Sequence, residues 1–350
     1  MSDIAPLIGE NRILVKEGLS LLNNGGSNKG IEALIEVSGL RGKEIGSFEI
    51  GFILGPRINA TGRLGSASEA VRLLLTDNAE EAEVLAKRLN DANRERQKIE
   101  SVTLKEALST IERDVNFKEH KVIILHKENW HSGVIGIVAS RITDRFYRPT
   151  ILISTKDGVG RGSGRSIESF HLFEALMGCE EVLKEYGGHK YACGLTILEK
   201  NLNQFKKTIN EIADSVLSAE DLIPRLDIDM EIGLSSLDSS IVKDVIELEP
   251  FGEQNPEPIF CSKKLRLVSP PRIIKGEHLK IYVTDGNKNF EAIGFGLARD
   301  ADIELFLRKC LEFDLAYTVS FNSWQGLRNI QLKIEDIRPS PSKNYTLQQC

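Results

Sequence analysis

The sequence predicts a mixed fold, in which a long helix joins an N-terminal helical segment to an α/β domain, and an all-β barrel follows. Strands and helices alternate with short links between residues 121 and 217, as in a compact α/β domain. Short strands with turn signals follow Pro224. The run 79–114 contains neither proline nor glycine, which predicts a rod of roughly 50 Å. A chain of 350 residues has room for two or three domains.

The N-terminal 75 residues carry helical patterns near 12–22 and 30–38. Thr76-Asp77-Asn78 then supplies N-cap candidates, and Glu80 and Glu81 fall in the first turn of the next helix. The long run that follows is typical of a connecting helix. A helical hairpin broken near its middle is the open alternative.

The α/β region is predicted element by element. The strands are expected at 121–125, 150–154, 158–166 and 192–198, and the helices at 133–146, 170–186 and 201–217. The helix 170–186 is expected to end at Gly187-Gly188-His189, because glycine commonly follows the last helical turn.

Ile223-Pro224 indicates a linker before the β region. Turn signals at Pro270-Pro271, Asp285-Gly286-Asn287 and 324–326 separate short strands. A small all-β barrel fits this pattern. Barrels of this size include the OB-fold, which often binds single-stranded nucleic acid. The tail 341–350 is predicted to be disordered.

Composition excludes several classes of protein. No apolar run approaches the ~20 residues of a membrane span, and the first residues do not form a secretory signal. Five scattered cysteines without a CxxC pair predict a reducing, cytoplasmic location and no disulfide framework. A net charge of −6 argues against a basic nucleic-acid coat protein.

Charge is nevertheless segregated along the chain. Residues 211–257 hold thirteen acidic side chains against Arg225 and Lys243. Residues 261–288 hold seven basic side chains against Glu277 and Asp285. A basic stripe on β strands suits a nucleic-acid backbone, and an ordinary solvated face is the alternative.

Two glycine-rich stretches carry hydrogen-bond donors. GPRINATGRLG (55–65) offers Arg57, Asn59 and Arg63 on a predicted loop, which suits phosphate oxygens as well as a salt-bridged turn. In GVGRGSGRS (158–166), strand alternation places Ser163 and Arg165 on one face and bare glycines on the other. A serine between arginines is a candidate anion site.

Two further stretches are weaker candidates. In HSGVIGIVASR (131–141), Ser132 is a possible N-cap, and a helix N-terminus favours anions. In Gly187-Gly188-His189, the next strand is expected to pair with 158–166 and to bring His189 near Ser163 and Arg165. His189 could then contact a phosphate or be a structural residue.

The histidines lack the paired spacings of metal sites, and the sequence contains no Asp-His-His triplet. The DxD in LDIDM (226–230) is interpreted as a solvated strand face.

As a set, these stretches resemble the RecJ single-stranded-DNA-specific 5′–3′ exonuclease family of the DHH phosphoesterase superfamily. The resemblance covers almost the whole chain and rests on SDIAPLIGENRILVKEGL, IGFILGPRINATGRLG, ANRERQKIE, HSGVIGIVASRI, GRGSGRSIESFHLFEAL, GGHKYACGL, LEPFGEQNPEPIF, HLKI and NSWQGLRNIQLKIEDIRP. Other DHH-superfamily relatives, such as short-oligonucleotide phosphoesterases or alanyl-tRNA-synthetase-like domains, would lack LEPFGEQNPEPIF and the β domain after it.

The resemblance implies a domain order. It gives a remnant of the DHH catalytic domain at 1–76, a connecting helix at 77–115, a DHH-associated nucleic-acid-binding domain at 116–220, an OB-like RecJ domain at 224–340 and the tail at 341–350.

The resemblance also implies roles for individual residues. Family enzymes hold manganese or magnesium with catalytic motifs that are missing here, and Asp3 matches one metal-binding Asp. One ligand is not expected to hold the metals. Arg57 would face the scissile or an adjacent phosphate, with Asn59 and Arg63 as further donors. Ser163, Arg165 and Gly187-Gly188-His189 would contact the 5′ end of single-stranded DNA, with the glycines letting the DNA backbone approach closely.

Two functional hypotheses follow from the resemblance. In the first, the chain is the C-terminal part of a truncated or split exonuclease whose metal site is supplied by a separate chain. In the second, it is a non-catalytic single-strand-binding or regulatory subunit. Exposure of the face of 1–75 that would pack on the missing domain would leave an apolar patch.

Overall fold

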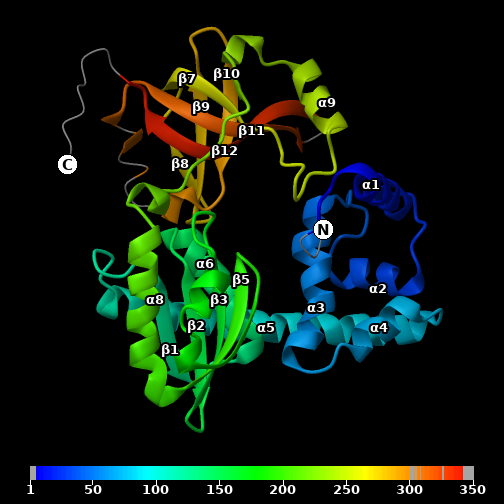
Figure 1. Cartoon of the computed structure of the whole chain (residues 1–350). Helices are drawn as coiled ribbons and strands as arrows, with labels where there is room; N and C mark the ends of the chain where they lie inside the picture. Colours follow the sequence, from blue (N-terminus) through cyan, green and yellow to red (C-terminus); the bar gives the residue numbers. More distant parts are fainter. Residues whose placement is uncertain (1–4, 300–302, 304–305, 308, 325–326, 342–350) are drawn as a thin grey trace. The chain divides into compact units, whose positions relative to one another are not determined.

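The computed structural model describes residues 5–299, 303, 306–307, 309–324 and 327–341 (Figure 1). Asp3 and residues 342–350 of the predicted tail lie outside the described residues. The chain divides into two compact units. The first is Leu22–Arg225, and the second combines Asp3–Leu21 with Leu226–Cys350. The boundary falls beside the predicted linker at Ile223-Pro224, and the predicted 1–76 segment contributes residues to both units.

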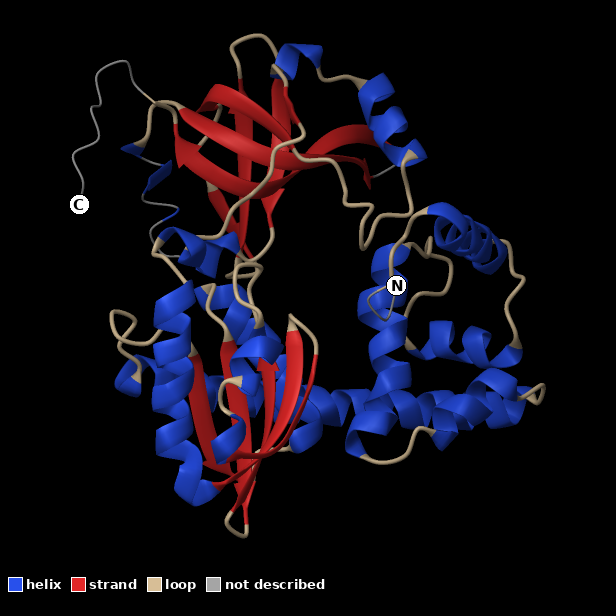
Figure 2. Cartoon of the chain, in the orientation of Figure 1, coloured by secondary structure: helices blue, strands red, loops and turns tan. Residues whose placement is uncertain are grey.

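The first unit begins with helices only (Figure 2). They are α2 (Lys29–Val37), the π-helix η1 (Glu49–Leu54), α3 (Gly55–Leu64), α4 (Ser68–Leu75) and α5 (Ala79–Asp114). The Asn78 side chain caps α5 by accepting from the N–H groups of Glu80 and Glu81 at 2.9 and 3.1 Å. The continuous helix is confirmed, and the broken-hairpin alternative is wrong.

Helix α5 belongs to two hydrophobic cores. Leu85 and Leu89 in its first half pack with Leu34 and other residues of the helical layer. Ile111 in its second half packs against α6 and the sheet. The helix therefore joins the helical layer to the α/β layer within one unit.

The α/β part of the first unit is a three-layer sandwich. Its elements are β1 (Ile123–Glu128), α6 (Ser132–Phe146), β2 (Thr150–Lys156), β3 (Val159–Arg165), α7 (Leu172–Met177), η2 (Glu180–Val182), β4 (Leu183–Gly188), β5 (Ala192–Leu198), η3 (Glu199–Asn201), α8 (Leu202–Val216) and η4 (Glu220–Leu222). The strand order is β1-β2-β3-β5-β4, with only β1 and β2 parallel. Helices α7 and α8 cover one face, and α5 and α6 cover the other.

The predicted helix 170–186 is wrong in its second half. Helix α7 ends at Met177, and residues 183–188 form the edge strand β4, which pairs with β5. Leu183 and Tyr186 pack on the core beneath the sheet. Pairing and packing of these side chains thus override a local sequence that favours helix.

The second unit holds a seven-stranded sheet. Its elements are α1 (Gly9–Asn23), β6 (Met230–Glu231), η5 (Leu234–Ser236), α9 (Ser239–Glu247), β7 (Phe260–Leu267), β8 (Arg272–Ile274), β9 (His278–Thr284), β10 (Asn289–Gly294), η6 (Leu297–Arg299), β11 (Phe313–Trp324) and β12 (Leu327–Pro339). The order is β6-β7-β11-β12-β10-β9-β8, and β7 also pairs with β9. Arg12 of α1 joins this unit by donating to the carbonyl oxygens of Glu247 and Glu249, each at 2.9 Å.

The turn between β9 and β10 is fastened by one carboxylate. Asp285 accepts from the N–H groups of Asn287 and Lys288, both at 2.9 Å. Its other oxygen accepts from the N–H and hydroxyl of Ser235 at 2.8 and 2.6 Å. These bonds favour the charged form, and they hold the pKa of Asp285 well below its ordinary value.

We expect Asp285→Ala to lower the free energy of unfolding by about 1–2 kcal/mol at pH 7, because a charged acceptor loses its donors. Because the folded-state pKa is depressed, this contribution is present above the unfolded pKa of about 4 and is lost as the pH falls further. Urea denaturation at pH 7 and pH 3 measures both effects. An equal loss at the two pH values would contradict the assignment.

Candidate nucleic-acid interface

The end of α3 lies directly against the start of α6. A Cβ atom on Gly133 would lie 2.2 Å from the backbone oxygen of Arg63, so this approach requires glycine. The exposed Arg63 guanidinium donates to the Gly133 carbonyl at 3.3 Å. His131 caps α6 by accepting from the Gly133 N–H, and the prediction of Ser132 as the cap is wrong because Ser132 is already helical. The contact holds Arg63 beside a helix N-terminus.

A buried polar stretch of α5 lies between the two cores of that helix. Arg96 is 9% exposed, and it donates to Asn93 at 3.2 Å and to Glu100 at 3.0 Å. The other oxygen of Glu100 pairs with the exposed Arg141 of α6 at 2.6 Å. Glu100 thus orients two guanidinium groups from different helices.

Strand β3 adds a third part of the site. The Arg165 guanidinium donates to the Ser163 hydroxyl at 3.2 Å and to the Gly164 carbonyl at 2.7 Å. A Cβ atom on Gly136 of α6 would lie 2.9 Å from Ser163 Oγ and 3.2 Å from an Arg165 nitrogen. The glycine therefore lets α6 approach the face of β3 that carries Ser163 and Arg165.

These groups form one electropositive cluster, which we call the arginine cluster: Arg63, Arg96, Arg141 and Arg165. Burial lowers the pKa of Arg165, and the charge of Arg63 lowers it further. Burial also lowers the pKa of Arg96, which Glu100 raises and Arg63 and Arg141 lower. Guanidinium groups stay charged despite such shifts, so the cluster holds four positive charges, two of which pair with Glu100. That excess favours an anion with several oxygens.

The predicted alternation along β3 is confirmed. Cβ atoms on Gly160, Gly162 and Gly164 would lie 2.7–2.8 Å from side chains of the core beneath the sheet. Ser163 and Arg165 occupy the opposite face, toward α6.

A bare strip of backbone continues from Ser163 across the sheet. Ser163 is in register with Gly194 of β5, and Gly194 is in register with Gly187 of β4. Gly194 and Gly187 are exposed, and a Cβ atom on Gly187 would meet nothing within 4 Å. We call Ser163, Gly194 and Gly187 the glycine strip. It forms an open floor over which a polymer backbone can pass closely.

The two glycines before His189 have different physical reasons. Gly188 has φ +141°, and a Cβ atom there would lie 2.3 Å from the Ala192 oxygen, so the tight turn requires it. Gly187 has open space beside it. The expected pairing of β5 with β3 is confirmed, and Ala192 lies opposite Arg165. His189 donates its backbone N–H to the Ala192 oxygen at 2.9 Å and is exposed.

The stretch 55–65 is helix α3, so its prediction as a loop is wrong. Pro56 is near the beginning of α3, and the π-helix η1 leads directly into that helix. Arg57 donates to Asn90 at 3.1 Å and to the Ile53 carbonyl at 2.6 Å. Burial and the charge of Arg94 lower the pKa of Arg57. Asn59 is exposed on the same helix.

Three of the seven basic side chains in the basic stripe of the second unit form ion pairs. Lys263, Arg266 and Lys280 pair with Glu231, Glu312 and Glu291 at 2.5–2.6 Å. Glu231, Glu312 and Glu291 lie outside residues 261–288, so a count of charges within that range does not include them. The stripe therefore offers fewer unpaired cations than its sequence indicates.

The donor set does not fit a divalent-metal centre in the described part of the chain. No three His, Cys, Asp or Glu side chains gather there closely enough to hold an ion. Asp3 cannot be assessed, because it lies outside the described residues. No hydrolytic step is therefore assigned to these residues.

Arg96, Arg141, Gly133 and Gly136 belong to the site but escape a residue-by-residue interpretation of the sequence. Arg96 and Glu100 are spaced i, i+4 inside ANRERQKIE, and Gly133 and Gly136 are spaced i, i+3 on α6. These spacings show shared helix faces, but they do not show which partner the faces meet.

Comparison with known proteins matches both sheets to one class of nuclease. Residues 119–215 match the DHHA1 domain, and residues 228–336 match the RecJ OB domain. The chain is 33% identical to the single-stranded-DNA-specific exonuclease RecJ of Bacillus subtilis, over 99% of this chain and 44% of that protein. It is 34% identical to RecJ of Escherichia coli, over 97% of this chain and 59% of that protein.

A solved structure gives the same result. The crystal structure of Thermus thermophilus RecJ with Mn²⁺ superposes with a TM-score of 0.82 at 32% identity, covering 97% of this chain and 48% of that one. The chain thus belongs to the class of proteins that combine a DHHA1 domain with a RecJ OB domain. The chain belongs to the RecJ single-stranded-DNA exonuclease family, and the predicted resemblance is confirmed.

The chain spans about half the length of the curated relatives it matches, from 44% to 60%. Within the described residues, no helix is both long and apolar enough to cross a membrane.

Proposed function

We propose that this chain carries the single-stranded-DNA-binding part of a RecJ-type 5′–3′ exonuclease. The arginine cluster beside the glycine strip carries this proposal. The four guanidinium groups, of which Arg96 and Arg141 pair with Glu100, suit phosphate oxygens, because arginine binds them with paired, charge-assisted hydrogen bonds. In the contacts described above, Glu100 is the one acidic side chain that pairs with guanidinium groups of the arginine cluster.

The binding mode follows from the positions of these groups. Arg63 and Arg165 bind the 5′-terminal phosphate, and the Ser163 hydroxyl donates to it. The adjoining nucleotide backbone passes over the glycine strip, where no side chain blocks it. His189 and the exposed Tyr191, in the turn between β4 and β5, offer a donor and a ring face for the first bases. Arg57 and Asn59 on α3 contact a neighbouring phosphate.

The second unit is proposed to be a closed OB-type barrel that binds the strand further from its 5′ end. The supporting observation is the pairing of its strands. Pairings β7–β11, β11–β12, β12–β10, β10–β9 and β9–β7 connect five strands in a ring. A ring of this kind removes sheet edges, as closed barrels do.

Hydrolysis is proposed to need manganese or magnesium ligands from outside this set of residues, on a separate chain or segment that carries the Asp-His-His motif. Such metals supply activated water for phosphodiester hydrolysis. One exposed apolar surface supports the proposal that a further chain or segment packs against the first unit. Phe48 and Phe52 stack at 5.1 Å between ring centroids, yet they are 60% and 73% exposed. We further propose a cytoplasmic location, where the four described cysteines stay reduced.

A non-catalytic single-strand-binding subunit is the second candidate. Its support is that the arginine cluster and the glycine strip consist of groups that bind phosphate and position a strand. The two candidates differ in one result. A split enzyme gains nuclease activity when a chain carrying the catalytic motifs is added, whereas a binding subunit does not.

Fluorescence anisotropy with a 20-nucleotide DNA tests the binding function. We expect 5′-phosphorylated single strands to bind about 100-fold more tightly than 5′-hydroxyl strands, because two guanidinium groups lose a dianionic partner, at about 1.5 kcal/mol each. Blunt duplex DNA should bind more weakly than both. The affinity should fall with salt at a slope of about −0.7 per phosphate contacted. Equal binding of duplex and single strands would contradict the proposal.

A further inference from the structure

Strand β1 is an edge strand with one unpaired side. The Ile123 N–H donates to the Pro149 carbonyl at 2.8 Å, and the Asn129 N–H donates to the Thr155 carbonyl at 3.2 Å. Odd-numbered residues of β1 therefore direct their backbone groups toward β2. Because strands alternate with period two, Ile124 and His126 direct their N–H and C=O groups away from the sheet.

Only the beginning of this side has a partner. The Asn210 side chain of α8 accepts from the Val122 N–H at 3.0 Å and donates to the Val122 carbonyl at 3.4 Å. Among the described residues, no hydrogen bond engages the backbone groups of Ile124 or His126. Asn210 thus takes the place of the first residue of an absent neighbouring strand.

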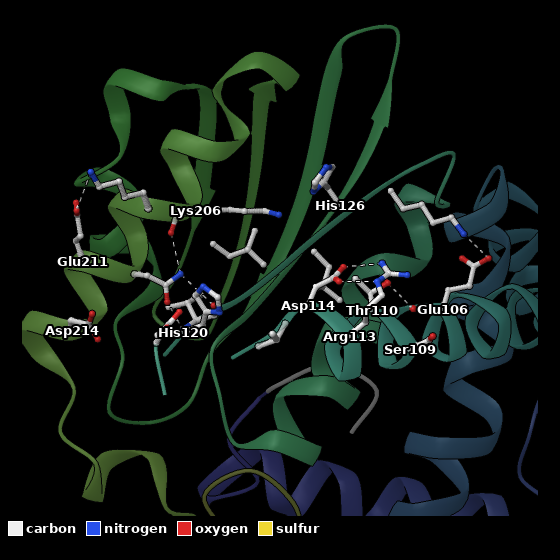
Figure 3. Close-up of a pocket in the computed structure, with 18 of the residues that line it drawn as sticks. Glu106, Ser109, Thr110, Arg113, Asp114, His120, His126, Lys206, Glu211 and Asp214 are labelled. Atoms are coloured by element: carbon white, nitrogen blue, oxygen red, sulfur yellow. Dashed lines mark hydrogen bonds and ion pairs between the residues drawn. The ribbon is translucent and has the colours of Figure 1, made fainter. Parts of the chain in front are cut away.

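The unpaired side opens into a cavity between α5 and α8, which Figure 3 shows and which we call the edge trough. Its volume is 1050 Å³, and Val122, Ile124 and His126 lie along its floor. Side chains of α5 and α8 form its walls, but neither helix bonds to the outward groups of Ile124 and His126. The trough is thus walled by two helices and open along the strand.

Most charges in the trough are already paired. Lys127 pairs with Glu106 at 2.8 Å, and Arg113 pairs with Asp114 at 2.7 Å. Lys207 of α8 lies 3.8 Å from Glu211.

Lys206 is different. Among the described residues it has no carboxylate within 4 Å, and Figure 3 shows it extending into the trough on the side of His126. Burial lowers the pKa of Lys206, and the charge of Asp114 acts in the opposite direction. Burial followed by the charge of Lys206 lowers the pKa of His126, and the charge of Glu199 acts in the opposite direction. Among the described side chains that line the trough, Lys105, Lys206 and Glu119 form no ion pair, so the unpaired groups carry an excess of one positive charge.

We propose that the edge trough is a docking site for an extended acidic segment of a partner protein, which adds to β1 as a further strand and places a carboxylate between Lys206 and His126. Strand addition satisfies the outward N–H and C=O groups of Ile124 and His126. A carboxylate compensates the half-buried Lys206. Native edge strands are normally covered, bulged or shortened, and β1 shows a regular register over six residues instead. The site is distinct from the arginine cluster and does not depend on DNA binding.

The probe is a fluorescein-labelled eight-residue peptide of alternating threonine and glutamate. We expect saturable binding, at least about tenfold tighter than that of the threonine–lysine peptide. Amide exchange at Ile124 and His126 should slow in the presence of the peptide, because those N–H groups become bonded. A peptide with N-methyl groups on alternate residues should not bind.

Two variants test the geometry. His126→Pro removes one outward donor at an edge position that tolerates proline, and His126→Ala is its matched control. We expect His126→Pro to weaken binding about fivefold more than His126→Ala, because one backbone hydrogen bond is lost. Lys206→Glu should abolish the preference for the acidic peptide, whereas Lys156→Glu, an exposed change outside the trough, should not.

Three results would overturn the proposal. The first is no binding of the acidic peptide at a peptide concentration of about 1 mM, at which even a weak single motif would bind. The second is equal binding by the two His126 variants. The third is slowed amide exchange at Ile124 and His126 when a single-stranded oligonucleotide is added in place of the peptide.

Discussion

The double variant Arg63→Gln/Arg165→Gln is expected to bind 5′-phosphorylated single-stranded DNA about 100-fold more weakly than the unchanged chain. Each guanidinium forms charge-assisted hydrogen bonds worth about 1.5 kcal/mol or more, and each 1.4 kcal/mol is a factor of ten in affinity. The two residues come from α3 and β3, and the contact between α3 and α6 brings their charges together. Anisotropy titration at fixed salt measures the loss.

Arg41→Gln/Arg145→Gln is the matched control, since it removes the same charge from two exposed arginines outside the arginine cluster. We expect it to change affinity less than threefold, because exposed charges at a distance are screened. The 5′-hydroxyl strand provides a second control. If the double variant lost affinity equally for 5′-phosphate and 5′-hydroxyl strands, these arginines would not bind the terminal phosphate.

Gly133→Ala is expected to have a large effect for a single added methyl group. The added Cβ would lie 2.2 Å from the Arg63 oxygen and 3.0 Å from its carbonyl carbon, both backbone atoms that cannot rotate away. Helices α3 and α6 must separate, so we expect the free energy of unfolding to fall by about 2–3 kcal/mol. DNA affinity should fall with it, because Arg63 is displaced. Urea denaturation and anisotropy measure the two effects.

Gly62→Ala is the control for Gly133→Ala. A Cβ atom at Gly62 would lie 3.6 Å from the Ala67 Cβ, an ordinary contact, and Gly62 is inside α3. Alanine should be neutral or stabilising by up to about 1 kcal/mol there. Equal stabilities for the Gly133→Ala and Gly62→Ala variants would mean that the close approach of α3 and α6 is not required.

Local sequence signals predict the regular elements of this chain well. Asn78 and the absence of proline and glycine predict α5, and the alternation in GVGRGSGRS predicts which face of β3 carries Ser163 and Arg165. These features depend on backbone chemistry within a few residues. The sequence is sufficient for them because no distant partner decides the outcome.

The errors arise where distant partners decide the structure. Residues 183–188 have helical neighbours along the chain, but they pair with β5. The Gly-Pro pair at 55–56 is typical of a turn, yet the preceding π-helix continues into α3. Arg96 and Arg141 join the arginine cluster through Glu100, a buried carboxylate whose partner on another helix is visible only in the fold.

The most direct test of the account is to incubate the purified chain with 5′-phosphorylated single-stranded DNA and manganese, and to measure binding and nucleotide release in the same samples. We expect the chain to bind the strand and leave it intact. We expect 5′ nucleotides to be released once a chain with the Asp-His-His motifs is added. Manganese-dependent release of 5′ nucleotides by this chain alone, abolished by Asp3→Ala, would contradict the account.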